Sequence, residues 1–215
     1  MQPKSNFFIN RAREENALIT DEMICKVACI LISAPFEDHF HEESLKRFDQ
    51  STLILTSKPS VKKLKKLGFN NIETLRAGAE KNIGDLLIRA HDAGFPYNYL
   101  WTFSFEIIQG GKVLYFESHV DKPSRIRQKG LKADCAILTT EEVKILGLLP
   151  LSNSSEATLK ILEELECKNI MIQGSDPSET KGLISYFLKI GEENLELFSN
   201  NGIKAFKEAG SEVTI

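Results

Sequence analysis

The sequence predicts an α/β fold with a mixed β-sheet. Residues 27–67 alternate short apolar runs with helical patterns, in the order strand, helix, strand, helix. Residues 101–117 contain two strand-like runs on either side of a Gly-Gly pair, which is typical of a β-hairpin. Residues 135–189 return to strand–helix units. We therefore expect antiparallel strands in the centre of the chain and strand–helix units on both sides.

The first third of the chain is predicted to hold two strands, each followed by a helix. The predicted elements are a strand at 27–33 (VACILIS), a helix at 42–48, a strand at 52–56 (TLILT) and a lysine-rich helix at 59–67. The first strand ends before Pro35, because proline cannot donate a backbone hydrogen bond to a sheet. Pro59 suits the first turn of the last helix, and Gly68 suits its end.

The middle of the chain is predicted to be antiparallel. The predicted strands are 86–90, 101–108 and 112–117, and Gln109-Gly110-Gly111 forms the turn between the last two. Glycine supplies the positive φ that a tight hairpin needs. Trp101, Phe103 and Phe105 fall on one face by strand alternation, so we expect them in the core.

The last third is predicted to consist of further strand–helix units. The expected elements are strands at 135–139 and 169–173, helices at 155–166, 178–189 and 195–209, and an edge strand at 213–215. Helix 155–166 carries an apolar stripe at helical spacing. Ser178 is a residue type that caps helices well, which favours a helix from that point.

Length and composition are those of an ordinary globular protein. The chain has 215 residues and a formal net charge of −3, which favours one domain over residues 1–215, with residues 1–22 as its flexible part. The weak negative charge argues against nucleic acid and an anionic membrane as partners. The lysines at 62–66 are interpreted as the solvated face of an amphipathic helix. The absence of a signal-like or membrane-spanning apolar stretch predicts a cytoplasmic protein, and Arg11 and Arg13 leave organellar targeting open.

The four cysteines, Cys25, Cys29, Cys135 and Cys167, are predicted to be free thiols in a reducing compartment. None of them forms a Cys-x-x-Cys pair. Cys25 and Cys29 have a spacing that also occurs in zinc sites, but no second pair of ligands follows them.

The segment that favours chemistry is residues 33–42 (SAPFEDHFHE), between a predicted buried strand and a helix. Such strand ends hold functional loops on a rigid scaffold. Asp38, His39 and His41 lie within four positions, and a carboxylate with two imidazoles is a donor set that suits zinc, iron or manganese. Structural roles stay open as well, because Asp38 can cap the following helix and His41 can face solvent.

Four segments of the chain resemble the metallo-β-lactamase superfamily in order and spacing: ISAPFEDHFHEESLKRF, TLILTSKPSVKKLKKLGFNNIETLRAGAE, KVLYFESHVD and LKADCAIL. The motif of that family is His-x-His-x-Asp-His after an apolar strand. When Asp38-His39 is placed on its last two residues, Ala34 and Phe36 stand where the first two histidines belong. The chain is thus similar to a diverged branch that lacks those histidines. The resemblance implies an αββα sandwich in one domain, shortened on its N-terminal side.

The other metal positions of the family are matched only in part. The resemblance implies that Asp38 and His39 bind a metal, and that Asp38 also serves catalysis by supporting the reactive water. His119 stands where the family has a metal-bridging aspartate, so it is the expected third ligand. Further candidate ligands near the remaining motif positions are His41, His91, Asp121 and Asp176. Phe95 and Gly174 stand where two further histidines of the family belong.

The number of matching ligands limits the chemistry that the resemblance implies. A one-metal catalytic site needs about three protein ligands and a two-metal site about six, so the chain is expected to hold one zinc or other divalent ion at most. The first hypothesis is a metal-dependent hydrolase acting on an ester, lactone or phosphoester bond of a small-molecule substrate. The second is a non-catalytic binding or assembly protein derived from that fold, which needs no metal. A homo-oligomer is compatible with both hypotheses. Phe36 distinguishes them, because it must turn away from a metal but can fill a non-catalytic pocket.

Overall fold

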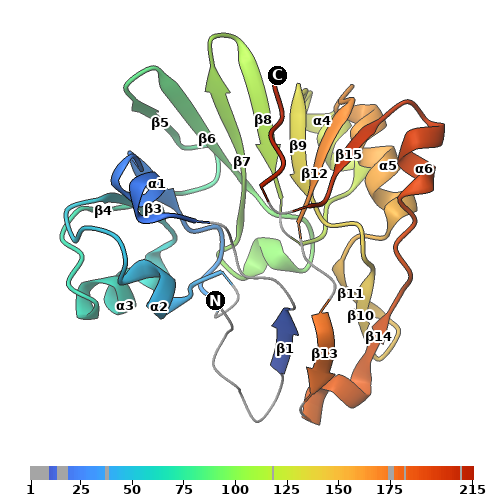
Figure 1. Cartoon of the computed structure of the whole chain (residues 1–215), viewed down its shortest axis with the longest axis horizontal. Helices are drawn as coiled ribbons and strands as arrows, with labels where there is room; N and C mark the ends of the chain where they lie inside the picture. The colour runs from blue at the N-terminus through green and yellow to red at the C-terminus, as the bar shows by residue number, and fades with distance from the viewer. Residues whose placement is uncertain are drawn as a thin grey trace.

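Two β-sheets lie between two groups of helices (Figure 1). The computed structural model describes residues 10–13, 19–36, 39–117, 119–173, 177–181, 183–208 and 210–215. The helices are α1 (Asp21–Cys25), α2 (Glu42–Leu45), α3 (Val61–Lys66), α4 (Pro123–Lys129), α5 (Ser155–Glu164) and α6 (Glu196–Asn200), with 3-10 helices η1 (Lys58–Ser60), η2 (Tyr97–Tyr99) and η3 (Leu183–Phe187). Within the described ranges, no helix has the length and apolar character that crossing a membrane requires.

The strands of the described residues belong to four sheets. They are β1 (Asn10–Arg13), β2 (Cys29–Leu31), β3 (Leu53–Thr56), β4 (Ile72–Thr74), β5 (Glu80–Ile83), β6 (Leu86–Asp92), β7 (Phe103–Gln109), β8 (Lys112–Phe116), β9 (Cys135–Leu138), β10 (Val143–Ile145), β11 (Leu149–Ser152), β12 (Asn169–Ile172), β13 (Pro177–Lys181), β14 (Leu188–Ile190) and β15 (Lys204–Phe206).

The small sheet of the sandwich has three parallel strands in the order β2-β3-β4. Its first two strands are the apolar runs that the sequence predicts. On one face, Ile54 of β3 packs in a buried cluster with Leu45 of α2 and Leu64 of α3. Gly68 follows α3 with a φ of +95°, a conformation that glycine adopts without strain. The predicted strand–helix order of this region is confirmed.

The large sheet has seven strands in the order β15-β12-β9-β8-β7-β6-β5. Strands β5 to β8 pair antiparallel, whereas β8, β9, β12 and β15 pair parallel. Gln109 pairs with Lys112, so Gly110 and Gly111 form the hairpin turn, with φ values of +57° and +81°. The predicted central hairpin is therefore confirmed, and so are the strands predicted at 135–139 and 169–173, which are β9 and β12.

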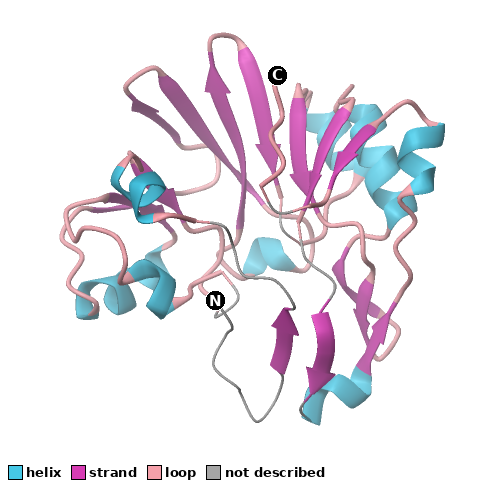
Figure 2. Ribbon diagram, in the orientation of Figure 1, coloured by secondary structure: helices cyan, strands magenta, loops and turns pink. Residues whose placement is uncertain are grey.

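Apolar side chains fill both faces of the large sheet. Leu55 of the small sheet shares a buried cluster with Ile88 and Phe105 of the large sheet, so the two sheets pack face to face. On the other face, Tyr115 packs in a second cluster with residues of α4, α5 and α6. The layers follow the order helix, sheet, sheet, helix (Figure 2), and the expected αββα sandwich is confirmed.

The remaining described strands form two further sheets that are not part of the sandwich. Strand β1 pairs antiparallel with β13, and the other sheet has the order β11-β10-β14. Strand β1 and the start of α1 lie inside the segment 1–22 that was expected to be flexible, and neither element was predicted. Residues 1–9 and 14–18 of that segment lie outside the described residues.

Three predictions for the C-terminal part are wrong. Segment 178–189 forms strands β13 and β14 around η3 instead of a helix, because β1 and β10 offer strand partners. The predicted helix 195–209 stops at Asn200, since Gly202 takes a φ of +69° and the chain then enters β15 beside β12. No strand occurs in the described stretch 210–215, and β15 is the edge strand of the large sheet instead.

Trp101 was predicted to lie in the core, and this prediction is wrong. It precedes β7 with a φ of +57° and is 52% exposed, whereas Phe103 and Phe105 are buried as expected. Because Trp101 lies outside the strand, alternation no longer places its side chain on the apolar face.

Native cysteine labelling should reflect the burial of the thiols. All four cysteines lie in the described part of the chain and are free; Cys25 is exposed, and Cys135 and Cys167 are buried. Burial raises the pKa of Cys29 and of Cys167 to about 11. Since the thiolate is the reactive form, iodoacetamide at about pH 8 should label Cys25 well before the others. Mass spectrometry of the native and the denatured protein measures this, and rapid native labelling of Cys167 would contradict it.

Candidate functional site

Two imidazoles from distant parts of the chain meet at one end of the sandwich. His39 lies in the loop that follows β2, and His119 lies in the loop that follows β8. Their ring centroids are 4.5 Å apart, and the ring planes are inclined by 33°. His119 is 5% exposed. The structure thus brings together two of the expected ligands, whereas Asp38 lies outside the described residues.

A polar group lies next to the Nδ1 atom of each imidazole. The Nδ1 atom of His39 lies 3.1 Å from the Oγ atom of Ser33, at the end of β2. The Nδ1 atom of His119 lies 3.7 Å from Oε1 of Glu117, which also accepts the backbone N–H of His119 at 3.0 Å. Glu117 is 1% exposed. Ser33 is thus within hydrogen-bond distance of the His39 ring, whereas Glu117 holds the backbone of His119 and lies beside its ring.

Two aromatic rings pack against His119. The Tyr97 ring lies 4.1 Å from it between centroids, at an interplanar angle of 32°. The Tyr97 hydroxyl donates a hydrogen bond to the carbonyl of Leu151 at 3.2 Å, which holds the ring in place. Phe36 meets His119 edge-on, at 6.1 Å and 86°, and also lies 6.5 Å from Tyr97. Phe36 is therefore turned toward His119 and not away from it.

Gly94 lets the Tyr97 loop approach the His119 loop. A Cβ atom at Gly94 would lie 2.3 Å from the backbone oxygen of Val120, which is far inside van der Waals contact. Only glycine fits at this place without moving one of the two backbones. The close approach sets Tyr97 beside His119.

Asp121 is held in a buried ion pair. Arg125 of α4 donates to both carboxylate oxygens of Asp121, each at 2.6 Å, and the Tyr115 hydroxyl donates to Oδ2 at 2.5 Å. Burial opposes the charge of Arg125, but Asp121, Tyr115 and Glu117 together raise the pKa of its guanidinium above the ordinary value. Burial, and then the charge of Asp121, also raise the pKa of Tyr115. With both oxygens engaged, the Asp121 carboxylate stabilises the loop after His119.

His91 and His41 are also engaged away from the pair of imidazoles. The Nε2 atom of His91 lies 2.8 Å from Oε2 of Glu106 on the neighbouring strand β7. His91 is in register with Ser104, whose hydroxyl accepts from Arg125, so its side chain faces α4. His41 is the N-cap of α2, where its Nδ1 atom accepts the backbone N–H of Ser44 at 3.3 Å. The structure does not bring either histidine to His119.

The described residues fit a metal ion only in part. Outside the undescribed positions, which include Asp38 and Asp176, no three His, Cys, Asp or Glu side chains gather closely enough to hold a metal. His39 and His119 are two donors, and a catalytic zinc takes about three from the protein. The described residues alone therefore do not complete a catalytic metal site.

Sequence reasoning missed Tyr97, Glu117 and Arg125. The resemblance pointed to Phe95 in the Tyr97 loop, but Phe95 is 56% exposed and its ring lies 6.5 Å from that of Tyr99. Glu117 was placed only at the end of a strand. A lone arginine on a helix gives no signal in the sequence that it will be buried. Its partner Asp121 had been interpreted as a candidate metal ligand, so the ion pair was not expected.

Comparison with known proteins gives matches among solved structures. No protein-family model matches the sequence, and no curated protein matches it. A possible metal-dependent hydrolase from Veillonella parvula matches with a TM-score of 0.72 and 12% identity, over 96% of this chain and 83% of its own. The isothiocyanate hydrolase from Delia radicum gut bacteria matches with a TM-score of 0.65 and 18% identity, over 91% and 78%.

A third matching structure is described by the name of its fold. The metallo-β-lactamase fold protein YhfI from Bacillus subtilis matches with a TM-score of 0.60 and 12% identity, over 88% of this chain and 78% of its own. The chain spans only 43% of the length of CmlA, a diiron β-hydroxylase from Streptomyces venezuelae, which it matches with a TM-score of 0.60 at 14% identity. At these identities the similarity establishes a common fold.

Proposed function

Because this chain has the metallo-β-lactamase fold, we propose that it is a non-catalytic binding protein built on that fold. The observation that carries the proposal is the position of Phe36, whose ring packs toward His119 and Tyr97. By the resemblance, Phe36 stands where the family has the second histidine of its motif. An apolar ring there removes a ligand and disfavours a nearby ion, because a charge loses hydration beside apolar surface.

The surroundings of Phe36 support the same interpretation. Ala34 stands at the position of the family's first motif histidine and is fully buried. Phe36 packs against a buried cluster of Ala93, Tyr97 and Val120. The half of the pocket that the first two histidines would line is thus occupied by apolar groups, and neither of these two positions offers a donor for a metal.

A one-metal hydrolase is the second candidate, and the orientation of the imidazoles favours it. Ser33 lies 3.1 Å from the Nδ1 atom of His39, and Glu117 lies 3.7 Å from the Nδ1 atom of His119, as polar groups do around metal-binding histidines. Asp38, His39 and His119 would hold the ion, zinc or another divalent metal. The metal would supply Lewis-acid chemistry for hydrolysis of an ester, lactone or phosphoester bond.

Metal analysis of the purified native protein separates the two candidates. For the non-catalytic protein, we expect far less than one equivalent of bound metal, and no rise in melting temperature on adding zinc or manganese, because ligands stabilise only a state that binds them. Phe36→Ala should also lower the free energy of unfolding by about 1 kcal/mol, since the ring is half-buried.

The opposite result would establish the second candidate. In that case the protein would hold about one equivalent of metal, and both His39→Ala and His119→Ala would lose it. The protein would also hydrolyse an ester or a phosphodiester, and a chelator would abolish this activity. His91→Ala is the matched control, because His91 pairs with Glu106 on the helix-facing side of the sheet and should not change metal content.

A cytoplasmic location is part of the proposal. It is supported by the four free cysteines, all within the described residues, since free thiols persist in a reducing compartment.

A further inference from the structure

A positively charged groove lies between α3 and the edge strand β4. It has a volume of about 810 Å³. Its polar lining consists of Lys58, Lys62, Lys65, Lys66, Arg76 and Thr74. The groove includes none of the residues that contact His39 or His119, so its binding properties are independent of the function proposed for that pair.

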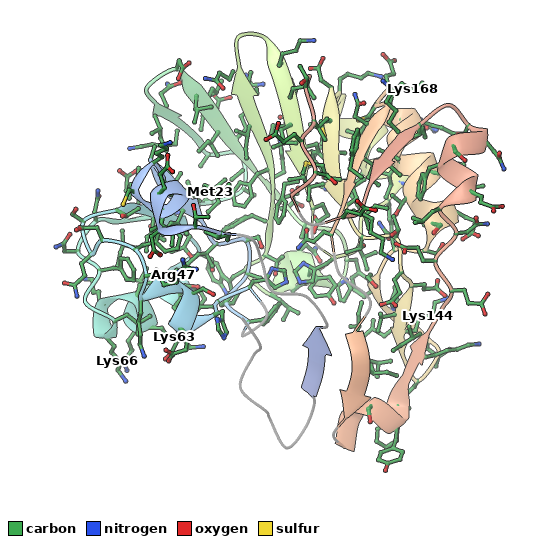
Figure 3. The ribbon with its side chains drawn as sticks, in the orientation of Figure 1. Met23, Arg47, Lys63, Lys66, Lys144 and Lys168 are labelled. Atoms are coloured by element: carbon green, nitrogen blue, oxygen red, sulfur yellow. The ribbon has the colours of Figure 1, made fainter. Side chains whose placement is uncertain are left out.

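The helix α3 directs its lysines to two different places. Leu64 is fully buried in the core under the small sheet, which fixes the rotation of the helix. Lys62, Lys65 and Lys66 are three and four residues apart, so they are neighbours on the helix surface and line the groove. Lys63 lies instead over the ring of Phe40, with Nζ 5.4 Å from the centroid. Figure 3 shows Lys66 projecting outward from the end of α3.

The carboxylates of the described residues do not balance these cations. The nearest one along β4 is Glu73, which strand alternation places on the face opposite Thr74 and which pairs with Lys81 at 2.7 Å. Among the residues with described positions, no ion pair involves any of the five cations of the groove. The protein as a whole carries a formal charge of −3, so this concentration of positive charge is local.

We propose that the groove between α3 and β4 binds a small, multiply phosphorylated molecule. Five cations around one concavity attract a ligand with several negative charges, and ammonium and guanidinium groups both donate strong hydrogen bonds to phosphate oxygens. The groove is open to solvent, so the charges of its lining, and not enclosure, would hold the ligand. The Thr74 hydroxyl adds a neutral donor at the edge of the groove.

The lining favours a small ligand over nucleic acid. Within the described part of the chain, no aromatic side chain lines the groove, so the lining offers no platform for base stacking. The negative charge of the whole chain also opposes a long polyanion that would extend beyond the groove.

Calorimetric titration of the full chain with tripolyphosphate and with a nucleoside triphosphate tests the proposal. Both should bind, more weakly as salt increases, and the corresponding nucleoside without phosphate should not bind. The double variant Lys62→Gln/Lys65→Gln should raise the Kd about tenfold or more, because two charge-assisted contacts are lost. Lys63→Gln is the matched control from the same helix and should leave the Kd within about twofold.

Three outcomes would overturn the proposal. They are no binding of either probe at low salt, an equal loss of affinity in Lys63→Gln, and tighter binding of a single-stranded oligonucleotide than of both triphosphates. The last outcome would assign the groove to nucleic acid instead. Because the substituted lysines are exposed, an unchanged melting temperature of each variant ensures that affinity and not folding is compared.

Discussion

Arg125→Leu should lower the free energy of unfolding by about 3–5 kcal/mol, because it leaves a buried carboxylate without its charged partner. The side chain of Asp121 is 0% exposed and that of Arg125 is 12% exposed. The guanidinium also donates to the backbone carbonyl of Asp92 at 2.7 Å, so it ties α4 to the end of β6. Without it, the donors that Asp121 keeps among the described residues are neutral: the Tyr115 hydroxyl and the backbone N–H of Lys122. Urea unfolding followed by circular dichroism measures the change.

Two variants make this test specific. Arg127→Leu, on the same helix, removes an ion pair with Glu164 in which the arginine side chain is 72% exposed, and it should be far less destabilising than Arg125→Leu because solvent screens the pair. Arg125→Leu/Asp121→Leu should be less destabilising than Arg125→Leu alone, because the uncompensated charge is gone. If Arg125→Leu costs no more than Arg127→Leu, the pair is not buried in solution.

Gly94→Ala should lower the free energy of unfolding by about 3 kcal/mol, the upper end for an overpacked site. The new Cβ atom would meet the Val120 backbone oxygen at 2.3 Å, and a backbone atom cannot rotate away as a side chain can. Either the Tyr97 loop or the His119 loop must shift. The NMR signals of the His119 ring should therefore also change, because the Tyr97 ring lies 4.1 Å from it.

Gly84→Ala is the matched control for this prediction. Gly84 has a φ of +59°, and none of the described residues comes within 4 Å of the place that a Cβ atom would take. Alanine there should cost only the backbone strain, about 1–2 kcal/mol. It should leave the His119 signals unchanged. Equal effects on His119 in both variants would show that the contact with Val120 does not set the geometry of the site.

Local sequence patterns correctly predicted those elements that depend on residues close together in the chain. The apolar runs that became β2 and β3, and the Gly110-Gly111 turn between β7 and β8, were all predicted from neighbouring residues. Each depends on a short-range cause, either burial of a continuous apolar run or the backbone freedom of glycine.

The C-terminal errors have the opposite cause. The segment 178–189 carries a capping serine, yet it forms β13 and β14 because β1 and β10 provide hydrogen-bond partners from far along the chain. Propensity is a weak preference that such tertiary pairing overrides.

The candidate site also combines features that the sequence predicted with features that only tertiary packing determines. His39 follows an apolar strand and His119 follows a hairpin, so both were placed at strand ends, and this much followed from the sequence and its resemblance. The sequence did not predict the partner of Asp121, because a carboxylate near a motif can bind a metal or an arginine equally well. Only the packing of α4 on the sheet brings Arg125 to it.

The sequence by itself determined β2 and β3 with the helices that follow them, the hairpin of β7 and β8, and the placing of His39 and His119 after strands, because these depend on residues close together in the chain. The tertiary structure decided that Phe36 and Tyr97 pack on His119, that Asp121 pairs with Arg125, and that five cations line one groove. The physical reason is that these contacts join side chains from separate elements, whose distances are set only when the sheets and helices pack.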